Sequence, residues 1–294
     1  RGLGYSIGTE TAITRVLRDE MFEGRFGEPV RIAAARNEFE SAQAVVVAYG
    51  KSLENVSVSM SELVGPGGAR IPAGRARLDL VDWVKTYPPR YAVEYIGWIP
   101  DPLVDLVPFD VPEGGLRPVW VTVHPPEGIP AGTYRGTLTV KPSNAPESSI
   151  PVEVNVWDFT LPTRMAMKTA FALFDYEISG WYGRFDDAMR REWYAFLLDH
   201  RVNPTNIYSK TPVPDRQFMQ YCADRGLNSF TLACTWYKEG KDLEELLAMI
   251  EDNRKYLTEH GWWDMPYIYG FDELGHDKYP ELRSTYGDIK RAFP

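Results

Sequence analysis

The sequence predicts a multi-domain chain with α and β structure: an N-terminal β-sandwich, followed by about the first four βα units of a (β/α)8 TIM-type barrel. Two observations carry this prediction. Short alternating strands, separated by Gly and Pro, fill the first half of the chain. Strand and helix patterns then alternate four times in the second half. We therefore expect a β-sandwich domain at 1–162 and a barrel domain at 163–294.

The first half owes its β character to alternation between apolar and polar residues. The run "IPVEVNVWDF" places Val152, Val154 and Val156 on one face of a strand, and "VSVSMSEL" alternates in the same way. The segment "RPVWVTVHPPEGIPAGTYRGTLTV" contains a strand, a Pro/Gly loop and a returning strand. The Pro-rich stretches "TYPPRY" and "WIPDPLV" are expected to be loops, because proline cannot donate a ladder hydrogen bond. Several strands at this spacing favour a sandwich.

The second half shows the periodicity of βα units. Strands are expected at 168–174, 204–208, 228–234 and 266–271. The helical spacing of the segments between and after them is clearest in "FDDAMRREWYAFLLDH" and "DLEELLAMIEDNRKYLTEHG". Such alternation indicates a parallel sheet, either open and doubly wound or part of a barrel. No Gly-rich phosphate loop follows the first strand, so nucleotide binding is not expected.

Composition excludes several classes of protein. The chain has 294 residues, 44% of them hydrophobic and 25% charged, which is typical of a globular protein. Its net charge of −9 argues against a nucleic-acid partner. No apolar run reaches the roughly 20 residues of a membrane-spanning helix. The two cysteines, Cys222 and Cys234, form neither a disulfide framework nor a metal-type cluster. We expect no cofactor, no metal and no membrane span.

The candidate catalytic residues are Asp272 and Glu273, which follow the fourth expected strand in "YIYGFDELG". Ligands of parallel α/β sheets bind beyond the C-terminal ends of the strands. Adjacent carboxylates lie too close together for a pair of residues that act from opposite sides of a sugar. They suit substrate-assisted hydrolysis, in which the 2-acetamido oxygen of the sugar attacks the anomeric carbon. Asp272 would orient the acetamido group and Glu273 would be the general acid and base. The alternative is an ordinary acidic loop.

Four further residues are candidates for substrate binding. Trp236 and Tyr237 end the third expected strand, where a ring could stack on a sugar. Asn206 lies in the second expected strand and could bind a hydroxyl group, and Asp175 follows the first. Each of them also has an ordinary structural interpretation in packing, turns or surface polarity.

The phrases "NEFESAQAVV", "PVWVTVHPPEGIPAGTYRGTLTV", "IPVEVNVWDFTLP", "HRVNPTNIY" and "YGFDE" resemble glycoside hydrolase family 123, the β-N-acetylgalactosaminidase type, with its wider relatives of unassigned function. The resemblance covers essentially the whole chain. It implies a β-sandwich before a TIM barrel, and an Asp-Glu pair after barrel strand four that works by substrate assistance. The first three phrases lie in the sandwich and carry the architecture, whereas "YGFDE" carries the chemistry.

The resemblance implies a retaining glycosidase that removes terminal β-linked N-acetylhexosamine, with N-acetylgalactosamine as the favoured sugar. The implied partners are a glycan or glycoconjugate and a further polypeptide segment that completes the barrel. If the chain stood alone without that segment, its site would be incomplete. The implied location is secreted, periplasmic or at the cell surface, although no signal peptide is visible. Two alternatives stay open: a non-catalytic carbohydrate-binding or scaffold protein, and a glycosidase on sugars that lack the 2-acetamido group.

Overall fold

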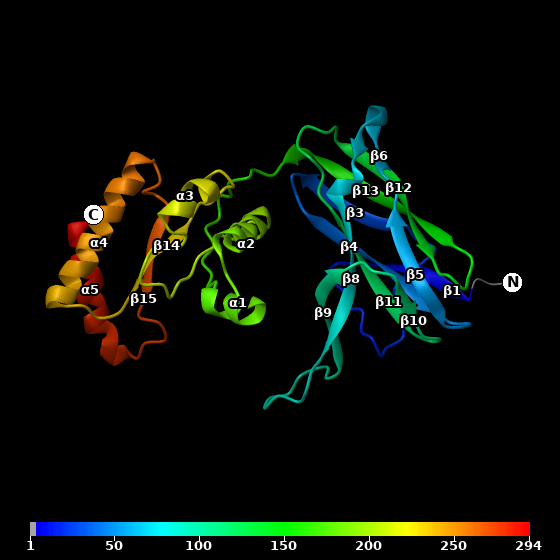
Figure 1. Cartoon of the computed structure of the whole chain (residues 1–294), viewed down its shortest axis with the longest axis horizontal. Coiled ribbons are helices and arrows are strands. Elements are labelled where there is room, and N and C mark those ends of the chain that lie inside the picture. Colours follow the sequence, from blue (N-terminus) through cyan, green and yellow to red (C-terminus); the bar gives the residue numbers. More distant parts are fainter. Residues whose placement is uncertain (1–3) are drawn as a thin grey trace. The chain divides into compact units, whose positions relative to one another are not determined.

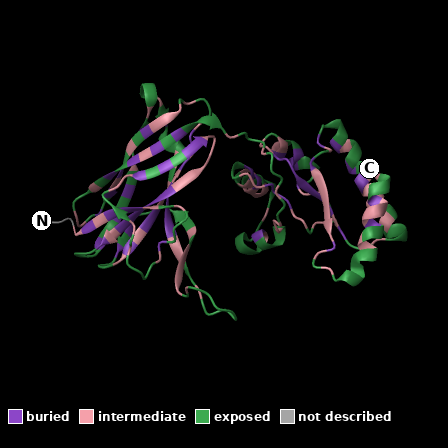
Figure 2. Cartoon of the chain, turned by 180° about the vertical axis from the view of Figure 1, so that it is seen from behind, coloured by how far each residue is buried: buried purple, intermediate pink, exposed green. Residues whose placement is uncertain are grey.

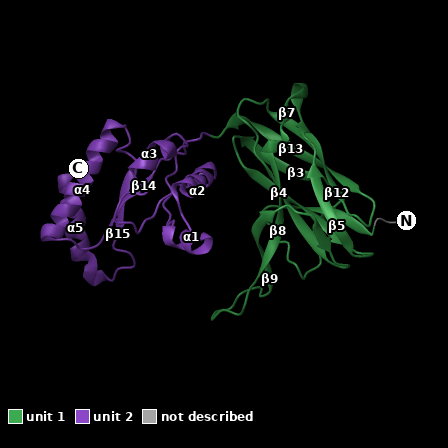
Figure 3. Ribbon diagram, viewed as in Figure 1, with its two compact units in different colours: residues 1–161 green, residues 162–294 purple. Residues whose placement is uncertain are grey.

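The computed structural model describes residues 4–294. They form two compact units, unit 1 up to residue 161 and unit 2 over residues 162–294 (Figure 3). Unit 1 is built almost entirely of β-strands, and unit 2 contains all five α-helices that the structure describes (Figure 1).

Unit 1 is a sandwich of two sheets, in which every strand pair is antiparallel except β3 with β13. The first sheet runs in the order β2 (Arg25–Phe26), β1 (Tyr5–Thr11), β4 (Glu40–Ala48), β11 (Leu116–Val123), β8 (Ala76–Lys85) and β9 (Trp98–Asp105). The second runs β10 (Phe109–Val111), β5 (Leu53–Met60), β12 (Gly132–Lys141), β13 (Ser148–Thr160) and β3 (Val30–Arg36), with β6 (Leu63–Val64) and β7 (Arg70–Ile71) attached to β12. Two short 3₁₀ turns, η1 (Pro66–Gly68) and η2 (Ala73–Arg75), connect the strands between β6 and β8.

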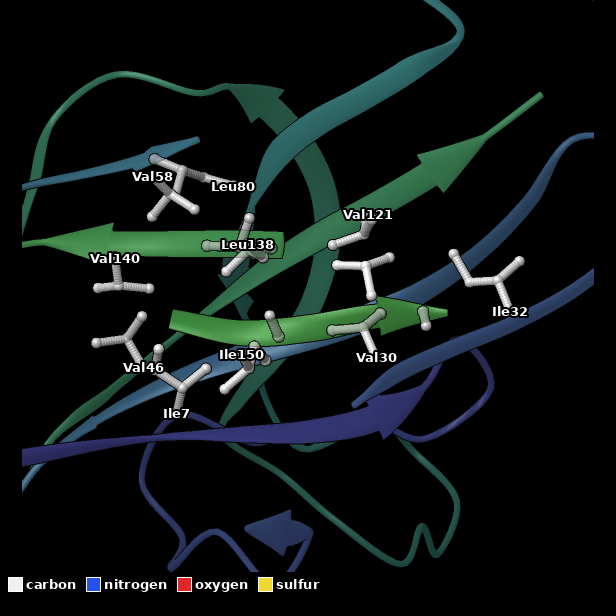
Figure 4. Packing of buried hydrophobic residues seen from close by; sticks show 14 of the residues in the cluster. Ile7, Val30, Ile32, Val46, Val58, Leu80, Val121, Leu138, Val140 and Ile150 are labelled. Atoms are coloured by element: carbon white, nitrogen blue, oxygen red, sulfur yellow. The ribbon is translucent and has the colours of Figure 1, made fainter. Parts of the chain in front are cut away.

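Strand β13 shows how the sequence pattern forms the core. Ile150, Val152, Val154 and Val156 are buried, and the residues between them are exposed or half-buried. Alternate residues of a strand point to opposite faces, so one face of β13 lies in the core and the other in water. Figure 4 shows the aliphatic side chains of both sheets packed together. Complete burial of one such side chain contributes about 1.5–3 kcal/mol.

The central strand β4 is buried on both faces. Val46 lies in the core between the sheets, whereas Val45 packs on the outer face with Val16 and Leu116. The segment between β1 and β2 supplies Val16 and so covers this face, and the indole of Trp83 donates a hydrogen bond to the Val16 carbonyl (3.1 Å). This cover explains why "SAQAVVVAY" is a continuous apolar run and does not alternate.

Unit 2 combines helices with a small parallel sheet. Its elements are α1 (Asp175–Tyr182), α2 (Asp187–Asp199), α3 (Arg216–Ala223), β14 (Phe230–Thr235), α4 (Gly240–Glu259), β15 (Pro266–Gly270), η3 (His276–Lys278) and α5 (Tyr279–Ala292). Residues from α2, α3, β14, α4 and α5 share one apolar core. The carboxylates of Asp186 and Asp215 accept backbone hydrogen bonds at the starts of α2 and α3, which is the usual way to satisfy free N–H groups there. Figure 2 shows the buried side of these helices and their exposed outer surface.

The predicted (β/α)8 TIM-type barrel is wrong. In residues 162–294, all of which the structure describes, only β14 and β15 pair as parallel strands, in a two-stranded sheet. The expected strands at 168–174 and 204–208 meet in a single antiparallel bridge, between Ala172 and Asn206. Residues 163–294 therefore do not form the first half of such a barrel.

Local chemistry explains why the ladder fails between these two segments. Pro204 has no N–H to donate. The hydroxyl of Thr205 accepts a hydrogen bond from the Phe171 N–H (2.9 Å) and donates one to the Phe171 carbonyl (2.8 Å). The Asn206 carboxamide accepts from the Tyr208 N–H (3.0 Å) and turns the chain. Two backbone hydrogen bonds still join the segments, from the Leu173 N–H to the Thr205 carbonyl (2.8 Å) and from the Ile207 N–H to the Phe171 carbonyl (3.1 Å), but the pairing extends no further as a ladder.

None of the helices in the described part of the chain is both long enough and apolar enough to cross a membrane.

Candidate active site

The candidate site lies where the two parallel strands of unit 2 end. Thr235 and Gly270 are paired in the last register position of β14 and β15. Trp236 follows the first strand, and Phe271 follows the second, with ring centroids 6.0 Å apart. Asp272 and Glu273 come next, in a turn that leads to η3. The pair therefore lies beyond the C-terminal end of a parallel sheet.

The backbone around the pair is held in an unusual conformation. Phe271 has φ of 55° and Glu273 has φ of 50°, both in the left-handed region. A non-glycine residue with positive φ is uncommon, and a bulky one is an outlier that the surrounding structure must enforce. The Phe271 ring is buried and contacts Trp236 and Tyr286. This packing fixes the turn that presents Asp272.

Asp272 is half-buried and lies between two tyrosines. The Tyr208 hydroxyl donates to its Oδ2 (3.1 Å). This hydrogen bond and the negative charge of Asp272 raise the pKa of Tyr208. A hydrogen bond to Asp272 likewise raises the pKa of Tyr269 to about 12, with desolvation second. The two rings meet edge to face, with centroids 5.7 Å apart. Both phenols therefore stay protonated as donors at neutral pH.

Glu273 has a different environment from its neighbour, since its side chain is exposed to solvent. Its positive φ turns the chain immediately after Asp272. One carboxylate is thus held by phenol groups and partly shielded, while the other is open to water. Two carboxyl groups in contrasting environments can take different roles in acid–base chemistry.

A cavity of ≈ 570 Å³ opens beside Tyr208. Its lining includes Phe174, Asp175, Arg190, Asn206 and Tyr208. The rings of Phe174 and Tyr208 lie nearly parallel, with an interplanar angle of 10° and centroids 6.1 Å apart. Tyr208 connects this cavity to Asp272 through its hydroxyl. The volume falls in the range of small-ligand sites.

The structure brings two of the predicted substrate-binding residues to this cavity. Asp175 begins α1, and its Oδ2 accepts a hydrogen bond from the Arg190 guanidinium (2.8 Å). Asn206 uses its side-chain oxygen to cap the Tyr208 N–H. Both residues therefore have structural roles, and the proposal that they bind substrate stays a prediction.

The other two predicted binding residues, Trp236 and Tyr237, follow β14. Their side chains are 46% and 41% exposed. The Tyr237 hydroxyl donates to Glu239 Oε2 (2.7 Å), which raises the pKa of Tyr237. Trp236 lies against Phe271, one residue before the carboxylate pair. It is the predicted aromatic residue whose contact leads directly to the site.

Sequence reasoning missed Tyr208, which donates a hydrogen bond to Asp272, and Tyr269, whose pKa Asp272 raises. One signal for Tyr269 was available, because it stands three residues before Asp272 in the strand that leads to the pair. Tyr208 lies 64 residues before Asp272 along the chain. Only folding brings it there, and no local pattern marks it.

Metal binding has no visible basis in the described residues. In residues 4–294, no group of three or more His, Cys, Asp or Glu side chains is arranged to hold an ion. The groups described at the site are carboxylates, phenols and aromatic rings.

Comparisons with known proteins agree with this architecture. Residues 25–142 match the family model described as the glycoside hydrolase 123 N-terminal domain. The resemblance to glycoside hydrolase family 123 is thereby confirmed over the matched residues, which lie in unit 1. The β-N-acetylgalactosaminidase type stays a prediction. No match was found among curated proteins.

Among solved structures, the chain is similar to a family 123 glycoside hydrolase from Clostridium perfringens, studied for the hydrolysis of glycolipid glycans. The TM-score is 0.73 at 12% sequence identity, a likeness of fold. The match covers 97% of this chain and 62% of that chain, so the present chain spans less than two thirds of its length. A PapD-like domain of human CEP192 is matched over 55% of this chain and 91% of that domain, with a TM-score of 0.30 and 9% identity.

Proposed function

We propose that this chain belongs to a retaining glycosidase that removes terminal β-linked N-acetylhexosamine, most specifically N-acetylgalactosamine, by substrate assistance. The observation that carries the proposal is the contrast between two adjacent carboxylates: Asp272 is half-buried and accepts a phenol hydrogen bond, whereas Glu273 is exposed. The relationship to glycoside hydrolase family 123 supports the reaction class.

Asp272 acts on the acetamido group in this mechanism. Its carboxylate accepts a hydrogen bond from the acetamido N–H and turns the acetamido oxygen toward the anomeric carbon. As that oxygen bonds to the anomeric carbon, the bond to the leaving oxygen breaks and an oxazolinium ion forms. The negative charge of Asp272 stabilises the positive charge that develops on this ion.

Glu273 moves the protons. In the first step its carboxyl group gives a proton to the departing glycosidic oxygen. In the second step its carboxylate takes a proton from water, and the resulting hydroxide opens the oxazolinium ring at the anomeric carbon. The acetamido group is restored, and two inversions give net retention. An exposed position next to the shielded Asp272 is consistent with access to both leaving group and water.

The aromatic residues complete the proposal. Trp236 and Tyr237 would cover apolar faces of the sugar, since flat rings pack well against pyranose C–H groups. Asn206 and Asp175, which line the cavity beside Tyr208, would bind hydroxyl groups with the polar atoms not used in their structural hydrogen bonds.

The test is a set of rates for wild type, Asp272→Asn and Glu273→Gln in the natural protein that contains this chain. Substrates are matched 2-acetamido and 2-hydroxy glycosides with sugar and activated phenol leaving groups. Glu273→Gln should be slow with a sugar leaving group and much less affected with the phenol, which departs without a proton. Asp272→Asn should lose roughly 10²-fold or more with both.

Each alternative function has its own outcome in this experiment. Comparable wild-type rates on 2-acetamido and 2-hydroxy sugars would exclude substrate assistance and favour an ordinary glycosidase. Sugar binding without hydrolysis would favour a carbohydrate-binding protein. Unchanged rates in both variants would make the pair an ordinary acidic turn.

A further inference from the structure

Two tyrosines from distant parts of unit 2 converge on one carboxylate. Tyr208 belongs to the turn after α2, and Tyr269 lies in β15. The hydroxyl of Tyr208 is 3.1 Å from Asp272 Oδ2. The rings of the two tyrosines stand perpendicular, with an interplanar angle of 90°. Asp272 is therefore bound by the hydroxyl of Tyr208, and Tyr269 from a separate segment packs against the Tyr208 ring.

Each tyrosine is held in place by the elements behind it. The Tyr208 N–H donates to the Asn206 side chain (3.0 Å), and its ring lies parallel to that of Phe174. Tyr269 is paired with Cys234 in the ladder between β14 and β15. The phenols are thus fixed by backbone structure before any ligand arrives, which is the condition for preorganisation.

The direction of the pKa shifts agrees with this geometry. The pKa values of Tyr208 and Tyr269 are both raised, with the hydrogen bond to Asp272 as the largest cause. A phenol whose hydroxyl donates to a carboxylate is harder to deprotonate, because the resulting phenolate would face a negative charge.

We propose that Tyr208, with Tyr269 packed edge to face against it, is a positioning residue that fixes the orientation of the Asp272 carboxylate for the acetamido group. The proposal rests on the function proposed above. The bond from Tyr208 occupies Oδ2, which leaves Oδ1 to accept the acetamido N–H. An aspartate held in this way cannot rotate away from the sugar. Its side chain is already ordered, so little conformational entropy is lost there when substrate binds. The phenols act through Asp272 and need not touch the sugar.

The first test measures kcat and KM for Tyr208→Phe, Tyr269→Phe and the double variant on an aryl 2-acetamido glycoside. Each loss of a hydroxyl that donates to a charged group should lower kcat by roughly 10- to 100-fold, with little change in KM. Tyr267→Phe is the matched control: its hydroxyl lies in the same strand but accepts from Thr231 (2.9 Å). That variant should keep the wild-type kcat.

A double-mutant cycle shows whether the phenols act through Asp272. In an Asp272→Asn background, the two Tyr→Phe substitutions should cause no further loss, because the carboxylate they position is gone. A full additional loss in that background would overturn the proposal. The proposal would also be overturned if the Tyr208→Phe/Tyr269→Phe double variant had the same kcat as Tyr267→Phe while Asp272→Asn had a lower kcat. That outcome would not contradict the proposed function.

A second readout needs no enzyme activity. Tyrosine rings labelled with ¹³C next to the hydroxyl are titrated by NMR, with Tyr208→Phe and Tyr269→Phe used to assign the two signals. In wild type both should titrate above an ordinary tyrosine, and in Asp272→Asn both should fall toward it. Unchanged titration in Asp272→Asn would overturn the proposed contacts. If the protein hydrolyses no 2-acetamido glycoside, the proposed function is overturned, while this titration still decides whether the tyrosines bind Asp272.

Discussion

Gly270 lies directly against the backbone of Thr235, its partner in the last register position of the parallel sheet of unit 2. A Cβ atom on Gly270 would stand 1.6 Å from the Thr235 carbonyl oxygen. Its φ of 150° is also one that L side chains rarely adopt. Only glycine allows the two strands to meet this closely, two residues before Asp272.

Gly270→Ala should therefore destabilise unit 2, by roughly 3 kcal/mol, because the two strands must separate at that point. Chemical denaturation followed by tryptophan fluorescence measures the loss. Gly180→Ala is the control: this helical glycine has open space around its Cβ position. Alanine there should be neutral or stabilise by about 0.5–1 kcal/mol. Equal stability of the two variants would contradict the close approach.

Glu273 combines a proposed chemical role with a strained backbone. Its φ of 50° costs a non-glycine residue roughly 1–2 kcal/mol, and its exposed side chain contributes no buried surface. Glu273→Gly should unfold at higher denaturant concentration than Glu273→Ala, with a difference of about 1 kcal/mol, although both lack the carboxylate. Both should hydrolyse sugar-leaving glycosides very slowly. A less stable Gly variant would show that the turn is not strained.

Patterns within one strand could be read from the sequence, and pairings between strands could not. The alternation of Val152, Val154 and Val156 matches their burial in β13. The stretch "WIPDPLV" was expected to be a loop, yet it forms β9, an edge strand. Pro100 and Pro102 are tolerated there because alternate N–H positions of an edge strand face water.

The candidate site shows the same division. The position of Asp272 beyond the end of β15 follows from the strand pattern alone. The barrel prediction failed because the segments around Ala172 and Asn206 meet in one antiparallel bridge and not in a parallel ladder, and the hydrophobic pattern does not show strand direction. The contact of Tyr208 with Asp272 depends on where a turn places one hydroxyl, and that is a tertiary property.

Two buried asparagines join three segments of unit 2. The Asn203 side chain donates to Asn228 Oδ1 (2.9 Å), and Asn228 donates to the carbonyls of Met165 (2.6 Å) and Met167 (3.0 Å). Asn203→Ala should cost about 1–3 kcal/mol, because buried polar groups lose their partner. Gln220→Ala, at an exposed position of α3, should change stability by less than about 0.5 kcal/mol. Thermal unfolding compares the two, and similar melting temperatures would show that the amide pair contributes little.

Alkaline pH should destabilise unit 2 through Tyr194. Burial raises the pKa of this side chain from 10.0 to about 12. Folding therefore favours the neutral phenol, and this contribution is complete below pH 10 and is lost as the pH rises toward 12. Unfolding free energies measured across this interval should fall less steeply in Tyr194→Phe than in wild type. Tyr221→Phe, which removes a hydroxyl bound to the Arg191 carbonyl, should keep the wild-type slope; equal slopes in all three would contradict this assignment.

The parallel pairing of β3 with β13 has a consequence for the order of folding during synthesis. Val30 and Val152 are partners in the ladder although roughly 120 residues separate them in sequence. As the ribosome releases the chain, β3 stays unpaired until β13 emerges. The entropy cost of closing the long loop between the two strands also opposes their pairing. Unit 1 should therefore acquire protease resistance abruptly, once nascent chains extend past Thr160, and shorter chains should expose β3 to chaperones.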